Sequence, residues 1–587
     1  MKDYFPIFDW SKNYGRADFE ADSLAAVIVT IMLIPQSLAY AMLAGLPPQV
    51  GLYASMLPLV AYMIFGTSHA LAVGPVAVVS LMTAAALGNI AATGSAGYLA
   101  GAVMLAFLSG VILLVMGVLK LGFLAYFLSQ PVISGFITAS GLLIAVSQLD
   151  HLLGLDVSGR SLPALLQGLW LNLPQTNFST LFVGGTSLAA LALIRSGLQP
   201  LLLKAGLSDR AAGNLAKAGP LAVILLSIGA VVVFDMQGRI AVTGEIPRGL
   251  PPLQFPVFDR DLIRLLLVPA LLISIIGFVE SVSVGQTLAA KAGKHIQPDH
   301  ELVGLGSANL VASLSGGYPV TGGFARSVVN FDAGAATPAA GGLTALGIAL
   351  ATLFFTPYLY FLPKAVLAAT IIIAVLSLVD LSPLKASWTF SRSDFIASLG
   401  TIAVTLLVGV EAGVATGVLA SLGLYLYKAS QPHIAEIGQV PGTQHFRNVK
   451  RHDVITSPKV LSLRIDENMF FANARYIENY ILSRLDGDEG LEHVTMNFAS
   501  VSLIDSSGQA VLHSVNKLLS KRGASLSFTE LKGPVEDRLK RGSLLQELSG
   551  SVYLHHYEAM TALDPAVFPP LRQARLEAQE AADGSHI

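Results

Sequence analysis

The chain has 587 residues, of which 53% are hydrophobic and 13% are charged, and a soluble domain carries about twice that charged share. Its net charge of −2 gives no sign of a basic surface for nucleic acid, and the lack of cysteine excludes disulfides, thiolate catalysis and cysteine-bound metals. Lys120 is the only Asp, Glu, Lys or Arg between Asp22 and Asp150, whereas charges become frequent after about Lys428. We therefore expect a large membrane domain followed by a soluble domain.

The first 20 residues are charged and aromatic and lack the apolar core of a cleavable signal, so residues 1–20 are expected to form a cytosolic N-terminal segment. Residues 21–430 should form the transmembrane domain. They contain fourteen apolar segments, at roughly 22–44, 50–65, 71–87, 96–118, 121–148, 177–194, 218–234, 262–284, 299–315, 323–335, 340–361, 363–379, 394–410 and 412–428. An even number places both ends of the chain on one side of the membrane. Lys and Arg favour the loops of that side, ten against six, which predicts cytoplasmic N- and C-termini in a multi-pass protein of the plasma (inner) membrane.

Two of these segments are too short or too broken to be ordinary spans. Leu71–Met82 is interrupted by Gly74 and Pro75, and Ser315–Ala335 is interrupted by Pro319 and the pair Gly322–Gly323. Interrupted helices in corresponding halves of a transporter are the best sequence indication of its binding site. The alternative is two kinked helices with a structural role only, because Gly and Pro are common in membrane spans.

A weak internal repeat supports two corresponding halves. The stretch from Leu33 to Leu38 resembles that from Phe278 to Val282, and Gln36 precedes Gly74 by 38 positions as Glu280 precedes Gly322 by 42. With seven spans in each half, the second copy would be inverted in the membrane relative to the first.

The broken helices predict an anion site. If their N-termini meet near the midplane, unpaired amides and the helix dipoles attract an anion, with the donors around Val76 and Ala77 in one half and around Phe324, Ala325 and Arg326 in the other. This binding needs no cofactor, metal or covalent chemistry, so we expect a transporter and not an enzyme.

Charged residues inside the membrane are costly, and Arg326 is therefore a functional candidate that adds positive potential to the site. The alternative for Arg326 is a structural pairing with Asp332 or with carbonyl groups. Glu280 lies 16 residues after Arg264 and 11 before Lys291, which places it well inside the hydrocarbon. Burial disfavours the charged carboxylate, so Glu280 could take up and release a proton during transport; a static partner for Arg326 or for a helix end is its alternative.

Gln36 and Tyr40 lie four residues apart, on one face of the first predicted span, where they could donate neutral hydrogen bonds to the anion. Core packing is an equally good interpretation of Tyr40.

Two long stretches resemble a known group, the SulP family of sulfate permeases and anion exchangers to which prestin and pendrin belong. They are PQSLAYAMLAGLPPQVGLYASMLPLVAYMIFGTSHALAVGPVAVVSLM, Pro35–Met82, and GFVESVSVGQTLAAKAGKHIQPDHELVGLGSANLVASLSGGYPVTGGFARSVVN, Gly277–Asn330. The resemblance implies an all-α membrane domain of fourteen spans in a 7+7 inverted repeat, with core and gate domains in the UraA-like arrangement. It also implies a homodimer in membrane lipid and an anion that binds between the third and tenth spans and moves by an elevator-like motion.

Residue by residue, the resemblance places the anion at Gln36, Tyr40, Val76, Ala325 and Arg326, and assigns proton or sodium coupling to Glu280. Some relatives have a serine where this chain has Ala325, so backbone amides would contribute more to binding here.

The C-terminal part resembles a STAS domain, a cytosolic α/β fold. Strands are expected at Val460–Ile465, His493–Ser500 and Ala524–Leu531, with helices between them. We expect a linker at 431–450, the STAS domain at 451–565 and a flexible tail at 566–587. Ser506 and Ser507 follow Asp505 at a strand-to-helix turn, where bacterial relatives are phosphorylated; a simple helix cap is the favoured alternative.

The resulting hypothesis is secondary active transport of an inorganic anion, first of all proton-coupled sulfate uptake. Within the same architecture, sodium- or proton-coupled bicarbonate transport, dicarboxylate transport and chloride exchange remain open. An anion channel or a receptor is disfavoured because the spans carry too few charges for a continuous polar pore. A nucleobase–proton symporter would need side chains that match the edge of a base, and GFARS, Gly323–Ser327, suits an anion better.

Overall fold

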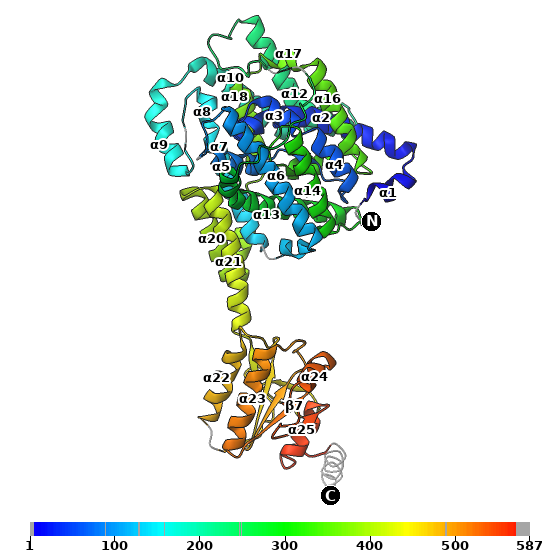
Figure 1. Cartoon of the computed structure of the whole chain (residues 1–587), viewed down its shortest axis with the longest axis vertical. Helices are drawn as coiled ribbons and strands as arrows, with labels where there is room; N and C mark the ends of the chain where they lie inside the picture. The colour runs from blue at the N-terminus through cyan, green and yellow to red at the C-terminus, as the bar shows by residue number, and fades with distance from the viewer. Residues whose placement is uncertain are drawn as a thin grey trace. The chain divides into compact units, whose positions relative to one another are not determined.

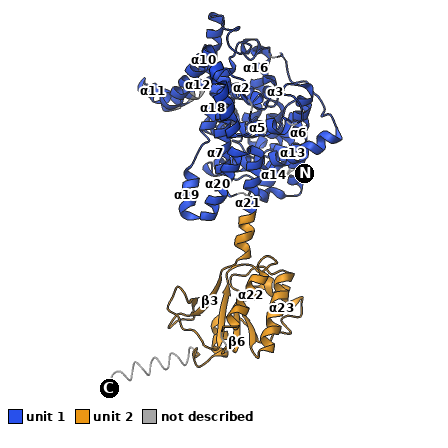
Figure 2. Ribbon diagram, turned by 90° about the vertical axis from the view of Figure 1, so that its left-hand side faces the viewer, with its two compact units in different colours: residues 1–422 blue, residues 423–587 orange. Residues whose placement is uncertain are grey.

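The structure, a computed structural model, describes residues 5–570 except 89, 127–128, 158, 246, 248 and 488–489. The chain forms two compact units, Met1–Leu422 and Gly423–Ile587 (Figures 1 and 2). The first unit is almost entirely helical, and the second combines a sheet with helices.

Each of the fourteen predicted apolar segments contains helix in the part of the chain that the structure describes. The helices run over α1 Ile7–Trp10, α2 Arg16–Leu43, α3 Pro48–Tyr53, α4 Leu57–Phe65, α5 Ala77–Leu87, α6 Ala96–Val118, α7 Gln130–Ser147, α8 Leu149–Leu153, α9 Leu162–Asn172, α10 Phe178–Leu193, α11 Gln199–Lys204, α12 Asp209–Val233, α13 Arg260–Lys291, α14 Pro298–Leu314, α15 Phe324–Asp332, α16 Ala339–Phe354, α17 Thr356–Leu359, α18 Lys364–Leu376, α19 Ser382–Phe390, α20 Arg392–Leu407 and α21 Val410–Ser430. Among the described residues, seven helices are long and apolar enough to cross a membrane, and four more are apolar but shorter.

Large apolar side chains are abundant on the outside of this unit. Phe182, Leu226 and Phe354 are 70%, 73% and 67% exposed. A water-soluble surface would not carry so many, because apolar area costs free energy in water but not in hydrocarbon. This pattern agrees with a multi-pass membrane domain whose outer face contacts lipid.

Two short strands mark the interrupted spans. β1, Val73–Gly74, leads into α5, and β2, Thr321–Gly322, leads into α15. The strands pair antiparallel, with Val73 opposite Gly322 and Gly74 opposite Thr321. Because each strand is followed at once by its short helix, the pairing of the strands brings the N-termini of the two helices close together.

The second unit contains a six-stranded mixed sheet in the order β4-β3-β5-β6-β7-β8. Its strands are β3 Ile434–Gln439, β4 Phe446–Asn448, β5 Val460–Ile465, β6 His493–Asn497, β7 Ser525–Thr529 and β8 Val552–Tyr553, and its helices are α22 Ala474–Leu485, α23 Ser506–Lys521, α24 Gly533–Lys540 and α25 His556–Leu563. β5 to β8 pair in parallel, and β3 joins β5 antiparallel. The strands expected at β5, β6 and β7 are present, with β6 and β7 slightly shorter than expected.

Three boundaries differ from the expectation. The first long helix, α2, already starts at Arg16, because the Gly15 N–H is capped by Asp18 Oδ2 at 2.9 Å. The segment expected as a linker contains β3 and β4, two short strands that extend the sheet edge; Pro432 precedes β3, and Pro441 lies between the two strands. Phe568 belongs to the expected tail yet is fully buried against Val460 and Met560; residues 571–587 lie outside the described part.

Candidate functional site

The N-termini of α5 and α15 lie next to one another because β1 and β2 pair. Val76 precedes α5 with φ −131° and ψ 153°, and Gly323 precedes α15 with φ −84° and ψ 129°, so the chain is extended up to each first helical residue. Both residues belong to the described part of the chain, and neither caps its helix through a side chain. The first-turn amides of both helices are therefore open to another acceptor.

Polar groups buried around the strands fix this arrangement. Ser327 Oγ on α15 accepts a hydrogen bond from the Ala72 N–H at 3.0 Å and donates to the Gly323 carbonyl at 2.7 Å. Asn330 Nδ2, one turn later, donates to the Ala70 carbonyl at 3.1 Å. The second half-helix thus holds the strand that leads into the first, and the two helix ends form one structural unit.

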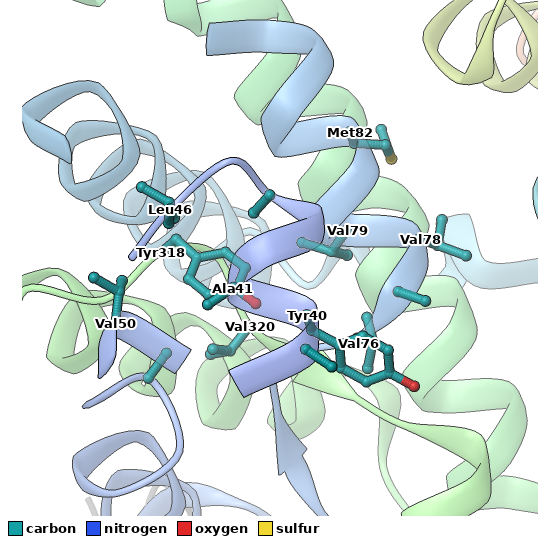
Figure 3. Packing of buried hydrophobic residues seen from close by; sticks show 14 of the residues in the cluster. Tyr40, Ala41, Leu46, Val50, Val76, Val78, Val79, Met82, Tyr318 and Val320 are labelled. Atoms are coloured by element: carbon teal, nitrogen blue, oxygen red, sulfur yellow. The ribbon is translucent and has the colours of Figure 1, made fainter. Parts of the chain in front are cut away.

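A cavity of about 40 Å³ lies at these helix ends. A water molecule needs about 10–15 Å³ on this measure, so the cavity has room for a small group of a few heavy atoms. All eight residues expected at the anion and coupling sites line it; the full lining is Gln36, Tyr40, Val76, Ala77, Val78, Glu280, Gly323, Phe324, Ala325, Arg326, Ala374 and Leu378. Figure 3 shows two of these lining residues, Tyr40 and Val76, near one another within the cluster of buried hydrophobic residues.

Arg326 is the dominant charge in this cavity. Its side chain is only 2% exposed, and neither Nη1 nor Nη2 has a hydrogen-bond partner among the described residues. Nη1 and Nη2 therefore do not form the structural pairing with Asp332 or with carbonyl groups that is the alternative interpretation of Arg326. A buried guanidinium with open donors is costly unless an anion completes its hydrogen bonds.

Two glycines make room for this guanidinium. A Cβ atom on Gly74 would lie 2.9 Å from Arg326 Nη1, and one on Gly323 would lie 2.8 Å from both Nε and Nη2. Only a residue without a side chain allows so close an approach. Gly74 and Gly323, predicted from the sequence as helix breaks, thus also allow the guanidinium of Arg326 to pack closely against the backbone of both interrupted segments.

Glu280 on α13 reaches the same cavity and lies within electrostatic range of Arg326. It also borders a second cavity, of about 20 Å³, whose other lining residues are Val78, Val132, Ile133, Phe136, Ile137, Ile276, Val279, Thr401, Gly413, Val414 and Gly417. Thr401 uses its hydroxyl on the Ala397 carbonyl, so the surroundings of Glu280 on this side are mostly hydrocarbon. Glu280 is the acidic residue of both linings.

Sequence reasoning missed part of the cavity lining. Ala374 of α18 and Leu378, two residues beyond the end of α18, also line the cavity. They are apolar residues of an apolar span, and no pattern in the sequence distinguishes them from their lipid-facing neighbours.

The predicted regulatory serines lie at the start of α23 in the second unit. Asp505 caps this helix by accepting the Gly508 N–H at 2.8 Å, and its other oxygen accepts the Phe471 N–H at 2.9 Å. Ser506 is exposed and Ser507 partly so. The cap is thus Asp505, and phosphorylation of Ser506 or Ser507 remains a prediction. Among the described residues, no cluster of three or more His, Asp or Glu is placed to hold a metal ion.

Comparison with known proteins bears on both units. The model of the sulfate permease family matches residues 19–401, and that of the STAS domain matches residues 451–559. The chloroplastic sulfate transporter 4.1 of Arabidopsis thaliana is 35% identical over 92% of this chain and 80% of its own length. The high affinity sulfate transporter 2 of Stylosanthes hamata is 30% identical over 96% of this chain and 86% of its own length. A solved structure of SLC26A9 superposes with a TM-score of 0.87 at 22% identity and covers 99% of this chain and 94% of its own, so the fold is shared.

Proposed function

The chain belongs to the sulfate permease family of membrane anion transporters and ends in a STAS domain, and from this premise we propose that it couples sulfate uptake to protons. The sulfate would bind between the N-termini of α5 and α15. The observation that carries the proposal is the guanidinium of Arg326, buried in a cavity at two helix N-termini with both terminal nitrogens unpaired. A dianionic oxyanion supplies the charge and the acceptors that these donors lack.

Glu280 is the group that we propose to carry the proton. It shares the cavity with Arg326, so a proton on Glu280 removes a negative charge from the surroundings of the anion. Its other neighbours are mostly hydrocarbon, which supports a proton over a sodium ion, because hard cations bind through several oxygen ligands at once. Proton and anion would then stabilise each other's binding by the same factor.

The packing around the cavity supports an elevator-like movement. Hydrogen bonds join α15 to Ala70 and Ala72, just before β1, whereas Ala374 of α18 and Leu378, just beyond it, line the cavity with apolar side chains. A surface without directional bonds can slide at lower cost than one stitched by hydrogen bonds. We propose that the half-helices move together past α18, in a plasma (inner) membrane protein whose termini are cytoplasmic.

The test is uptake of labelled sulfate by proteoliposomes that contain the full chain, under imposed proton or sodium gradients. We expect an inward proton gradient to drive uptake, and Glu280→Gln to reduce this uptake to the level without a gradient while sulfate binding remains measurable. Glu411→Gln is the matched control, because Glu411 is a partly buried acid on α21 outside the cavity lining. Proton-driven uptake that survives Glu280→Gln, or uptake driven by sodium alone, would contradict the proposal; a panel with bicarbonate, fumarate and chloride tests the choice of sulfate.

A further inference from the structure

Two buried hydroxyls connect the helix of Glu280 to the strand before α15. Thr321 Oγ1 donates to the Gly277 carbonyl of α13 at 2.6 Å, and Ser281 Oγ lies 2.6 Å from Thr321 Oγ1. The Gly322 N–H donates to Ser281 Oγ at 2.9 Å. Ser281 is 0% and Thr321 1% exposed, so water does not compete for these bonds.

Each hydroxyl has one proton to donate, which orders the network. The chain of bonds runs from the Gly322 N–H to Ser281, from Ser281 to Thr321 and from Thr321 to the Gly277 carbonyl, and leaves no donor unused. Ser281 Oγ also lies 2.6 Å from the Gly277 oxygen, so it has a second acceptor in reach. A Cβ atom on Gly277 would lie 3.0 Å from Thr321 Oγ1, so this glycine permits the close contact of strand and helix.

The network joins the two charged residues of the cavity. On α13, Ser281 directly follows Glu280; on the strand, Gly322 directly precedes Gly323, against which the guanidinium of Arg326 packs. A shift or rotation of α13 at Glu280 therefore displaces the first-turn amides of α15 and the seat of Arg326. Asn309 of α14 holds Val320, the residue before Thr321, because its side-chain amide accepts from the Val320 N–H at 2.9 Å and donates to the Val320 carbonyl at 2.8 Å.

We propose that Ser281 and Thr321 are positioning residues that transmit the protonation state of Glu280 to the anion affinity of the α15 end. The proposal rests on the proposed function, since it concerns the coupling between proton and anion. Neither Ser281 nor Thr321 is among the residues that line the cavity. The two hydroxyls act through their hydrogen bonds to the backbone of Gly322 and Gly277, and together they fix the position of the start of α15 relative to α13.

The experiment is equilibrium binding of labelled sulfate to the purified full chain at about pH 6 and about pH 8. For the unaltered chain we expect affinity about tenfold higher at the lower pH, an ordinary size for coupling between two ligands. Ser281→Ala should reduce this pH ratio to about twofold or less, because α15 no longer follows α13. Thr321→Val should have a smaller effect, since Ser281 can still join Gly322 to Gly277 directly. Ser281→Thr, which keeps the hydroxyl, should restore most of the ratio.

Ser274→Ala is the matched control. Ser274 is also a buried hydroxyl of α13, 1% exposed, but its acceptors are the Ala270 carbonyl of its own helix, at 2.7 Å, and the Ser109 carbonyl of α6, at 3.4 Å. We expect the Ser274→Ala chain to show the same ratio of sulfate affinities at the two pH values as the unaltered chain. A Ser281→Ala chain that is less stable but keeps the full pH ratio would overturn the inference, because the hydroxyls would then have a structural role only. If the unaltered chain binds sulfate equally at both pH values, the proton coupling of the proposed function fails and the inference fails with it.

Discussion

Arg326 in the membrane unit and His556 in the STAS unit are both large, buried ionisable side chains, and they differ in how their hydrogen bonds are completed. Arg326 in the membrane unit is 2% exposed and leaves Nη1 and Nη2 without a partner among the described residues. His556 in the STAS unit is 3% exposed, yet its Nε2 lies 2.6 Å from Ser462 Oγ and its Nδ1 lies 2.8 Å from Thr529 Oγ1. Burial alone therefore does not identify a functional residue. Unpaired donors that also line a cavity at two helix ends are the stronger indication, because a ligand in that cavity can complete their hydrogen bonds.

The largest effect that this comparison predicts is on anion affinity. Arg326→Ala removes charge-assisted hydrogen bonds to the anion and should weaken sulfate binding about 100-fold. It should not lower the thermal midpoint of the membrane unit, because the lost guanidinium ends were unpaired and costly to bury. Sulfate binding and differential scanning fluorimetry on the same samples measure both quantities.

Arg326→Lys is the partner variant, since it keeps the charge but loses the planar fork of donors, and we expect intermediate affinity. If Arg326→Ala bound sulfate as the unaltered chain does and melted at a lower temperature, Arg326 would belong with His556 as a structural residue.

A second prediction concerns the other half of the site, which offers backbone donors without a charge. Ala77 is the first helical residue of α5, a position that tolerates proline because its N–H has no partner within the helix. Val76 before it is already extended, as a residue before proline prefers. Ala77→Pro should therefore delete one amide donor with little harm to the fold and weaken sulfate binding about tenfold.

Ala77→Ser, which keeps the amide, is the control and should bind sulfate nearly as the unaltered chain does. If proline left the affinity unchanged, the first half-helix would contribute shape to the cavity and no donor to the anion.

Much of this site could be predicted because the membrane restricts the chain so strongly. Hydrocarbon forces backbone polar groups into helices, so apolar runs located the spans, and the breaks at Gly74 and Gly322 located the helix ends. Once those ends were placed, Val76, Ala325 and Arg326 followed from their positions in the chain. The cavity contains all of them.

The remainder depends on contacts between segments far apart in sequence. Ser281 and Thr321 are ordinary small polar residues until the fold brings them together, and Ala374 differs in no visible way from other alanines of α18. In the STAS unit, Phe568 and the strands β3 and β4 were missed because a short segment after a turn gives too weak a pattern to separate a strand from a linker.

The smallest predicted effect tests the structural side of the comparison. Burial lowers the pKa of His556 from its usual 6.5 to about 4, so the folded STAS unit keeps this imidazole neutral where the unfolded chain protonates it. The stability that the neutral form provides is complete above about pH 6.5 and is lost as the pH falls towards 4. At about pH 5.5 the STAS unit should be about 1 kcal/mol less stable on this account.

Urea pulse proteolysis of the full chain, followed through STAS fragments at about pH 7 and about pH 5.5, measures this loss. The decisive quantity is the difference between the unaltered chain and His556→Gln, whose amide can still bond Ser462 or Thr529 but does not titrate. We expect the variant to lose about 1 kcal/mol less between the two pH values, with sulfate binding unaffected in both chains. Equal losses would show that the pKa of His556 is the same in the folded and the unfolded chain, and that burial does not keep this imidazole neutral. If His556→Gln changed the sulfate affinity, a buried side chain with completed hydrogen bonds would also influence anion binding, and the distinction drawn between His556 and Arg326 would fail.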